Sequence, residues 1–374
     1  MKWPDNQAEA NQAPKIGQKQ MMIMQLSRKA FIIIATTAIA ASSAAALVSN
    51  QGSERPGEES DTTSQPKATS SPTFTFTAFG DAGWADTHIK RPRYSGGFEK
   101  AFLRFNSKHN TLGDINYINW ETSVGTQCDQ FWTKHTPSTF AFLTHPNELE
   151  DAIKLGFNVI GLANNHTFDC IRSKEGNGPI QSYHFIASLA KKNPNIAFSG
   201  VFSKASEEPT LKDIALKQGN IPVTFLSAYV GGNSSHCANM SCSINLSRAK
   251  IAFSDKRRLR ILALHSWNKS SHQELKATLR HWVQSNLVDI AIGTGPHIAE
   301  SIEIVNTKNG KKILATSLGN FIHPSLSPQP YNAVLQSTWK INAASKEPEL
   351  IRVKAIKASC DGGSCLNTGT INLN

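Results

Sequence analysis

Several signatures of common enzyme classes are missing from this 374-residue chain. It contains no P-loop, no HExxH and no GxSxG motif, so nothing in it supports a P-loop nucleotidase, a zincin protease or a serine hydrolase of the α/β type. It also shows no repeat of fixed period, which argues against a solenoid or a propeller. Hydrophobic residues make up 39% of the chain. That content is enough for a sizeable core, and one large domain is plausible at this length.

Charge is absent from residues 30–48, a run rich in Ala and Ile that follows Arg28 and Lys29. A basic region, an apolar run and small residues near a possible cleavage point at residues 44–46 are typical of an export signal. About 19 uncharged residues can also nearly span a bilayer, so an uncleaved anchor is the alternative. We therefore assign residues 1–29 to a polar leader with a basic region, and residues 30–48 to a signal peptide or membrane anchor.

Apolar side chains are almost absent from residues 49–72, and this composition predicts a disordered linker. The globular domain should then span residues 73–374. Seven of the 39 basic and six of the 28 acidic residues precede Thr73, so this domain has a net charge near +10. Outside the cytoplasm it would attract an anionic polymer or an anionic membrane surface, although solubility alone is an equally simple explanation. Export argues against nucleic acid as a partner.

The six cysteines are an even number, which fits an oxidising compartment. Two pairs each enclose a short polar loop, and the remaining two cysteines follow predicted strand ends and could join two loops there. A zinc site is the competing interpretation, but no second nearby Cys or His pair completes a tetrahedral set. Disulfides are therefore favoured, with candidate pairs Cys128 and Cys170, Cys237 and Cys242, and Cys360 and Cys365.

Strand and helix patterns alternate along most of the domain, and consecutive strands follow. Predicted helices cover residues 98–105, 148–155, 180–192 and 273–287. Predicted strands cover residues 73–79, 115–120, 157–162, 196–199, 221–228, 259–265 and 288–292, and then 301–305, 312–317, 333–341 and 350–356. Alternation followed by a run of strands predicts an α/β fold in which two sheets lie between helices.

The most informative stretch is residues 156–169, GFNVIGLANNHTFD. Its apolar first half predicts a buried strand, which ends in Asn164, Asn165 and His166, with Asp169 three residues later. Open α/β sheets place their ligands at the carboxyl ends of strands. An amide oxygen and an imidazole at such an end can both face one metal ion or one phosphate. The alternative is an Asx-type turn in which His166 is an ordinary structural residue.

Comparable motifs end other predicted strands. In chain order these are Gly80-Asp81, Asn119-Trp120-Glu121, His265, Gly-Thr-Gly-Pro-His297 and Ser317-Leu-Gly-Asn-Phe321. Together with ANNHxxD, this series resembles the CapA capsule-synthesis family, also described as poly-gamma-glutamate synthesis proteins, within the calcineurin-like metallophosphoesterase superfamily. The resemblance covers roughly residues 73 to 325 and continues weakly to about 357. Six motifs in the right order are far more specific than any one of them.

The resemblance implies a four-layer α/β/β/α sandwich with the motifs on one rim. It also implies one or two divalent ions (Mn, Zn or Fe), held by Asp81, Glu121, Asn165, His265 and His297, with Glu121 able to bridge two ions. His166 would act as a general acid or phosphate contact, oriented by Asp169. Asn119 would hold Glu121 by hydrogen bonding, and Asn164 would be a further supporting residue.

The chain departs from the family pattern at three places. Gly83 stands where the superfamily usually has a histidine, Ser266 follows His265 where related chains usually read Trp-Gly, and Thr294 and Gly295 occupy a loop that often carries a second histidine. Fewer imidazoles would mean a weaker or single-ion site. The other histidines, His323 among them, are treated as structural or surface residues, although His323 follows the SLGNF motif closely.

Three functions follow as hypotheses. The first is an exported, metal-dependent hydrolase of the phosphoesterase type that helps to make, release or anchor an anionic capsule polymer such as poly-gamma-glutamate. The second is a non-catalytic envelope component on the same fold that binds this polymer or its synthesis machinery. The third is a hydrolase of a glutamyl amide. Each places the protein in the periplasm or cell envelope, and an uncleaved N-terminal segment would hold it at the membrane.

Overall fold

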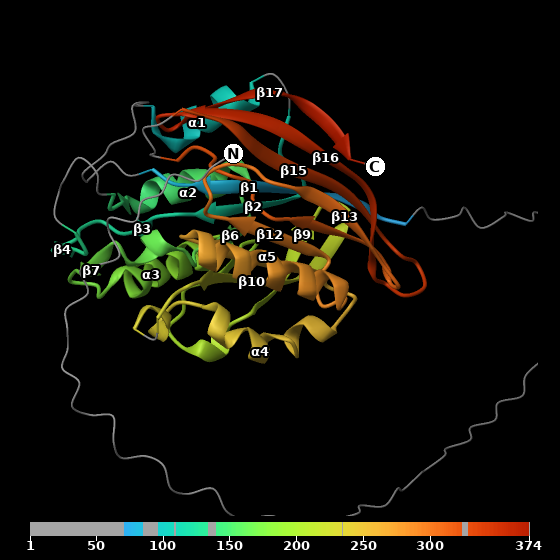
Figure 1. Cartoon of the computed structure of the whole chain (residues 1–374), viewed down its shortest axis with the longest axis horizontal. Helices are drawn as coiled ribbons and strands as arrows, with labels where there is room; N and C mark the ends of the chain where they lie inside the picture. The colour runs from blue at the N-terminus through green and yellow to red at the C-terminus, as the bar shows by residue number, and fades with distance from the viewer. Residues whose placement is uncertain are drawn as a thin grey trace, which may run out of the picture. The chain divides into compact units, whose positions relative to one another are not determined.

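The structure is a computed structural model that describes residues 71–84, 96–107, 110–133, 140–233, 235–323 and 328–373. These residues belong to a unit that spans Lys67–Asn374. Its two main sheets are accompanied by helices (Figure 1), so the predicted mixed α/β class is confirmed. The leader, the apolar segment and all but the last two residues of the predicted linker lie outside the described residues. Within the described residues, no helix is both long enough and apolar enough to cross a membrane.

The larger sheet has seven strands in the order β17-β16-β15-β1-β2-β6-β8. Strands β1, β2, β6 and β8 are parallel neighbours, while β15, β16 and β17 extend the sheet in antiparallel fashion from β1. The strands are β1 (Thr73–Ala82), β2 (Ile115–Trp120), β6 (Val159–Gly161), β8 (Ala197–Ser199), β15 (Gln329–Ile341), β16 (Pro348–Asp361) and β17 (Ser364–Leu373). Because β1, β2 and β6 are parallel, their carboxyl ends meet at one edge of the sheet.

The smaller sheet has six strands in the order β13-β14-β12-β11-β10-β9. Its four central strands are parallel, and an antiparallel strand closes each edge. The strands are β9 (Thr210–Leu216), β10 (Gly219–Val230), β11 (Leu259–Ser266), β12 (Ile290–Thr294), β13 (Ile302–Thr307) and β14 (Gly310–Ala315). Two small sheets pair β3 (Ser123–Val124) with β5 (Leu143–Thr144), and β4 (Gln130–Phe131) with β7 (Cys170–Arg172).

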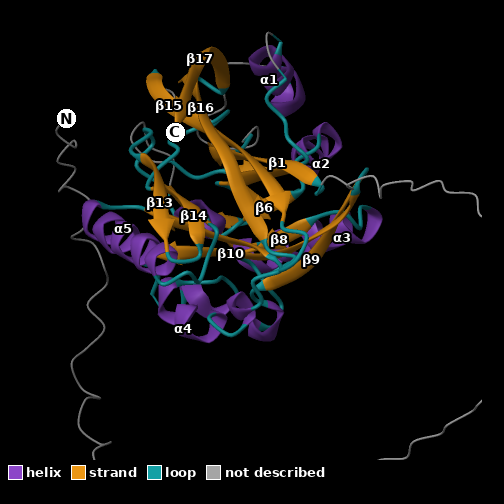
Figure 2. Ribbon diagram, turned by 90° about the vertical axis from the view of Figure 1, so that its right-hand side faces the viewer, coloured by secondary structure: helices purple, strands orange, loops and turns teal. Residues whose placement is uncertain are grey.

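Local signals explain where the helices begin and end. Pro146 opens α2 after His145, whose ring accepts a hydrogen bond from the Asn147 N–H, and Gly156 ends the helix with φ 112°. Asn268 caps α5 by accepting from the Ser271 N–H. The helices are α1 (Gly97–Asn106), α2 (Pro146–Leu155), α3 (Gly178–Lys192), α4 (Leu246–Ala249) and α5 (Lys269–Gln284). Figure 2 shows them distributed around the two sheets.

Strand alternation divides the buried apolar side chains into separate clusters. In β11, Ile261 joins a cluster that contains side chains of both sheets, while Leu262 belongs to a cluster formed with α5 and α4. A third cluster joins the larger sheet to α1, α2 and α3, and Phe79 of β1 packs there against Phe157 with ring centroids 5.0 Å apart. Apolar contacts therefore hold each sheet on both of its faces.

The structure corrects the predicted elements at the sheet edges. The strands β9 and β17, the short strands β3, β4, β5 and β7, and the short helix α4 were not predicted, and most other boundaries move by a few residues. In β17 the sequence SCLNTGTINL is polar and largely exposed, so it lacks the alternation that marks a half-buried strand. Its strand conformation comes from pairing with β16.

All three candidate disulfides are present in the structure. Cys128 is bonded to Cys170. The other two disulfides each join cysteines five positions apart in the sequence, Cys237–Cys242 and Cys360–Cys365. No cysteine of the chain is left free. The disulfide prediction is confirmed, and it is consistent with an oxidising compartment.

Candidate metal centre

Three acidic or imidazole side chains from three strand ends meet in the interior. Asp81 lies near the end of β1, Glu121 directly follows β2, and His265 lies near the end of β11. One ligand atom from each of them lies within 4.8 Å of the other two, and all three side chains are buried. Two of these strands belong to the larger sheet and one to the smaller. The site therefore forms where the carboxyl ends of strands from both sheets converge.

A glycine allows the end of β1 to approach the SLGNF segment closely. A Cβ atom on Gly80 would lie 1.9 Å from the Gly319 carbonyl oxygen, so no other residue fits there without movement. The Asp81 N–H donates to that same oxygen at 2.9 Å, and the Phe321 N–H donates to the Asp81 carbonyl at 2.6 Å. Two motifs that are more than 230 residues apart in the chain thus fix the backbone of Asp81 together.

The Asp81 carboxylate has a partner on each oxygen. The Asn119 amide donates to Oδ1 at 2.6 Å, and the Gly295 N–H donates to Oδ2 at 2.8 Å. The His265 Nδ1 atom lies 3.3 Å from Oδ1. Asn119 was predicted to hold Glu121, and this role is wrong. Asn119 is the β2 residue paired in register with Asp81, so its amide meets the Asp81 carboxylate.

Glu121 is fully buried and faces three imidazoles. Its Oε1 atom lies 3.3 Å from His265 Nε2 and 3.9 Å from His297 Nε2, and its Oε2 atom lies 3.0 Å from His323 Nε2. Burial alone would raise the pKa of Glu121, but the nearby His323 and His265 imidazoles outweigh it and hold the pKa well below its usual value. The carboxylate is therefore ionised at neutral pH.

His323 is the site residue that the sequence analysis missed. Its ring centroid lies 5.8 Å from that of His297 and 6.4 Å from that of His166, so it stands among the predicted site histidines. Burial lowers the pKa of His323, which favours the neutral imidazole that binds metals. The available signal was its place two residues after Phe321, whose backbone bonds Asp81.

The ANNH motif supplies the next contacts. Asn165 is half-buried, and its amide oxygen lies 2.7 Å from His265 Nε2. The other ring nitrogen of His265 lies 2.9 Å from the Thr294 hydroxyl. Asn164 points away from this contact: its side chain accepts from the Thr167 N–H and donates to the Trp120 carbonyl, each at 2.9 Å. Asn164 therefore positions the turn that carries Asn165 and His166.

His166 and Asp169 form a buried pair beside these groups. His166 Nδ1 lies 2.7 Å from Asp169 Oδ2, which also accepts from the Phe142 N–H at 2.6 Å. Burial would lower the pKa of His166, but the Asp169 carboxylate reverses this effect and the pKa is raised. Burial also raises the pKa of Asp169. Because Asp169 engages Nδ1, Nε2 is the ring nitrogen of His166 that lies outside this pair.

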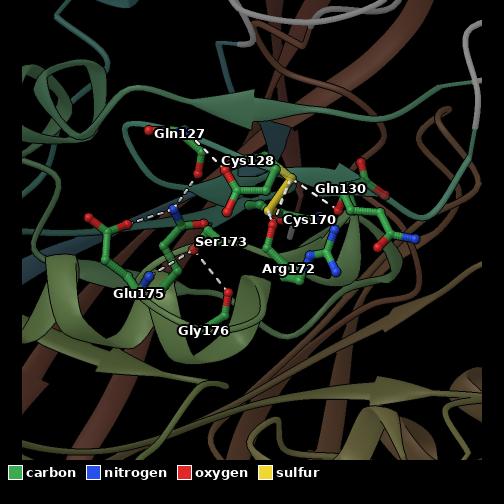
Figure 3. Close-up of a disulfide and its surroundings, with 12 residues drawn as sticks. Gln127, Cys128, Gln130, Cys170, Arg172, Ser173, Glu175 and Gly176 are labelled. Atoms are coloured by element: carbon green, nitrogen blue, oxygen red, sulfur yellow. Dashed lines mark hydrogen bonds between the residues drawn. A yellow bond between two sulfur atoms is a disulfide. The ribbon is translucent and has the colours of Figure 1, made fainter.

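A disulfide anchors the segment that follows this pair. Cys170, the residue after Asp169, is bonded to Cys128 (Figure 3). The loop containing Cys128 is held further by Gln181, whose amide donates to the Gln127 carbonyl and to Glu175, each at 2.8 Å. The Trp132 N–H donates to the Asp169 carbonyl at 3.0 Å. Covalent and hydrogen-bonded contacts thus limit the movement of Asp169.

The donor set suits a divalent cation. It holds two buried carboxylates, an amide oxygen and several imidazoles, the mixture that Zn, Mn and Fe accept. Among the described residues, Asp81 and Glu121 form close pairs with histidines and none with Lys or Arg. Two buried carboxylates without a basic partner are costly unless a cation compensates them. The buried Asp81–Glu121–His265 group can therefore hold a metal ion.

Comparison with known proteins agrees with the motif series. The family model described as bacterial capsule synthesis protein PGA_cap matches residues 75–325, which include every residue of the centre described above. A search of curated proteins finds no match. The family match covers more than half of the chain and confirms the resemblance based on the strand-end motifs. The chain belongs to the bacterial capsule synthesis protein family PGA_cap.

Proposed function

We propose that this protein is an exported, metal-dependent hydrolase that acts on an anionic capsule polymer or on a precursor or anchor of that polymer. The observation that carries the proposal is the convergence of Asp81, Glu121 and His265 within 4.8 Å, buried and without a basic partner among the described residues. A phosphoester of the polymer or its carrier is the favoured bond. A polymer of the poly-gamma-glutamate type fits the net positive charge of the domain.

The residues divide into two groups around Glu121. Asp81 and the Asn165 amide both contact His265, which approaches Glu121 Oε1. His297 approaches the same oxygen and His323 approaches Oε2. The first group would hold one ion, and Glu121 with His297 and His323 could hold a second. A bound ion would activate water and neutralise charge that develops on phosphoryl oxygens.

His166 supports a proton-transfer role. Asp169 fixes the ring through Nδ1 and raises the pKa of His166, so Nε2 can carry a proton at neutral pH. A protonated Nε2 can donate to a leaving-group oxygen or contact a phosphoryl oxygen. Phe142 limits where this ring can lie, because its centroid is 4.6 Å from that of His166.

The remaining parts of the proposal concern architecture and location. A four-layer α/β/β/α sandwich is supported by the apolar clusters on both faces of both sheets. Export through residues 30–48, followed by a linker up to residue 72, is supported by their composition and by the disulfides. The protein would then act in the periplasm or cell envelope.

The decisive experiment is metal analysis of the full-length oxidised protein. We expect stoichiometric Mn, Zn or Fe in the wild type, and loss of it in Asp81→Asn and Glu121→Gln. His323→Ala should lower the amount or the affinity of bound metal more than tenfold. The exposed His281→Ala in α5 is the matched control and should keep the wild-type content. Each variant should also give a wild-type circular dichroism spectrum.

The same preparations test the reaction. Metal-loaded wild type should hydrolyse model phosphoesters, and His166→Ala should lose this activity while it keeps the metal. Folded wild type that binds no metal would refute the proposal and favour a non-catalytic component that binds the polymer or its synthesis machinery. Metal binding with hydrolysis of γ-glutamyl amides and no hydrolysis of phosphoesters would refute the favoured bond and support an amide hydrolase.

A further inference from the structure

Residues 243–258, named here the α4 segment, form an outer surface that the metal centre does not use. The segment runs through a short 3-10 helix (Ser243–Asn245), α4 and a second 3-10 helix (Ala252–Ser254). Both views place α4 at one end of the molecule, opposite β17 (Figures 1 and 2). Leu246 and Phe253 are buried on the inner side, where Phe253 packs on Trp282 of α5 with ring centroids 5.4 Å apart.

The outer side of the segment carries two isoleucines. Ile244 is 66% exposed and Ile251 is 83% exposed, the largest exposed fraction among the large apolar side chains described. Ile244 lies in the 3-10 helix before α4, and Ile251 lies two residues after α4 ends, so the two exposed isoleucines flank this short helix. One exposed apolar residue is ordinary, but two that flank one short helix at an end of the described domain are a more specific pattern.

Positive charge surrounds these isoleucines. The segment contains five basic residues and one acidic residue, Asp255. Arg257 is paired with Asp255 through two contacts of 3.0 and 3.1 Å, and Arg258 donates to the Val223 and Lys212 carbonyls. Among the described residues, none forms an ion pair with the other three, Arg248, Lys250 and Lys256, which are all exposed. Three basic side chains are thus available to an external anion.

We propose that the α4 segment docks on an anionic membrane surface. Ile244 and Ile251 would enter the interfacial region, while Arg248, Lys250 and Lys256 would contact lipid phosphates. Exposed apolar side chains with flanking Lys and Arg are the chemical combination by which interfacial segments bind anionic lipid. The charge is complementary to anionic lipid, and each Lys or Arg near such a surface strengthens association about fivefold.

The sequence upstream of the domain supports a membrane over other occupants. The uncharged residues 30–48 predict a signal or an anchor, and either one brings the chain to a membrane. A second copy of this chain would present the same positive segment, so like charges would oppose pairing through this face. The inference does not depend on the metal centre or on the reaction proposed for it.

The test uses the full chain with one introduced cysteine labelled with bimane, whose fluorescence reports an apolar environment. All six natural cysteines are in disulfides, so a new thiol can be labelled selectively. Ile251→Cys is the probe, and Ile371→Cys on β17, where the residue is 44% exposed, is the matched control. Both proteins are added to nanodiscs that carry doxyl-labelled quencher lipid, with either phosphatidylglycerol or only phosphatidylcholine.

We expect strong quenching at position 251 in phosphatidylglycerol discs, at least fivefold weaker quenching in phosphatidylcholine discs, and little at position 371. Adding Arg248→Gln and Lys250→Gln to the probe protein should weaken its apparent affinity for the anionic discs at least tenfold, with unchanged thermal unfolding. Equal quenching at both positions, or none at position 251, would overturn the proposal. A blue shift at position 251 without lipid that grows with protein concentration would also overturn it, in favour of self-association.

Discussion

At the scale of single residues, Glu121 connects the parts of the candidate centre. Its carboxylate lies within 4 Å of nitrogens on His265, His297 and His323, which come from three separate segments of the chain. The loop after β12 lacks a second histidine because Thr294 and Gly295 stand there. His323 brings an imidazole to Glu121 from a different segment. The expectation of an imidazole-poor site therefore needs correction, because His323 adds to the predicted set.

A carboxylate outside the centre, Glu208, predicts a specific pH dependence of stability. Burial raises the pKa of Glu208 to about 8, although its contacts with the Ser199 hydroxyl and the Gly200 N–H work in the opposite direction. The pKa of a glutamate in the unfolded chain is about 4.3. Between these values the folded protein holds a proton that the unfolded chain has lost. The contribution of Glu208 to the free energy of unfolding is therefore fully present below about pH 4 and is lost as the pH rises towards 8.

The substitution Glu208→Gln should remove this loss of stability at higher pH. Glutamine stays neutral and can keep both contacts, so the variant should gain stability over the wild type as the pH rises. From pH 5 to pH 8 we expect a relative gain of at least about 1.4 kcal/mol, the equivalent of one pKa unit. Urea unfolding at several pH values measures this difference. If the free energies of unfolding of the two proteins change with pH in parallel, Glu208 is not protonated in the folded protein.

At the scale of elements, the Cys128–Cys170 disulfide joins β7 to the loop before β4, next to Asp169. It closes a separation of 42 residues, so chain entropy predicts a stabilisation of about 3–4 kcal/mol. Cys128→Ser with Cys170→Ser should lower the free energy of unfolding by this order. It should also reduce activity more strongly than metal content, because the segment next to His166 and Asp169 is released while the Asp81 cluster is not.

The Cys237–Cys242 bond provides the comparison for this prediction, since it closes only five residues. Replacing both of these cysteines by serine should cost less stability and leave the ratio of activity to bound metal unchanged. Urea unfolding, metal analysis and phosphoester hydrolysis give the three measurements. Equal effects of the two double variants on that ratio would show that the Cys128–Cys170 bond has no special role in placing Asp169.

The sequence predicts some elements and site residues well, and the physical reason differs from case to case. The strands β2, β6 and β11 are buried along their whole length, because both faces of a central parallel strand are covered. Apolar stretches such as Ile261–Leu264 in β11 made them recognisable. The edge strands β9 and β17 lack such runs, since pairing with a neighbour holds them. Asp81, Glu121 and His265 were predicted from motifs, and the structure brings them together.

His323 escaped prediction because its position depends on an uncommon turn. Ile322 adopts a left-handed φ of 48°, which is rare for a β-branched residue and has no pattern in the sequence. The role of Asn119 was predicted wrongly for a related reason. Which carboxylate its amide meets depends on the register between β1 and β2, and that register shifts between Ala78 and Asp81. Neither feature can be derived from local sequence.

At the scale of the whole molecule, the proposed ion would connect the two sheets. Asp81 and Glu121 belong to the larger sheet and its following segment, and His265 belongs to the smaller sheet. Metal at 100 times its dissociation constant should therefore stabilise the entire domain by about 2.7 kcal/mol. Thermal unfolding of the full chain should shift upward with added Mn or Zn and downward with a chelator. The unfolding temperature of Asp81→Asn should change with neither addition. A shift as large as that of the wild type would contradict Asp81 as a metal ligand.

The pairing of β1 with β15 has a consequence for how the chain reaches its final form. The first strand of the domain forms hydrogen bonds with a strand that is made about 250 residues later, and it lies between that strand and β2 (Figure 1). A growing or translocating chain that ends before Gln329 leaves one edge of β1 without its neighbour, with Phe74 and Phe76 lacking part of their cover. The larger sheet can therefore be completed only after β15, β16 and β17 have emerged, and until then the incomplete sheet is open to chaperones and proteases.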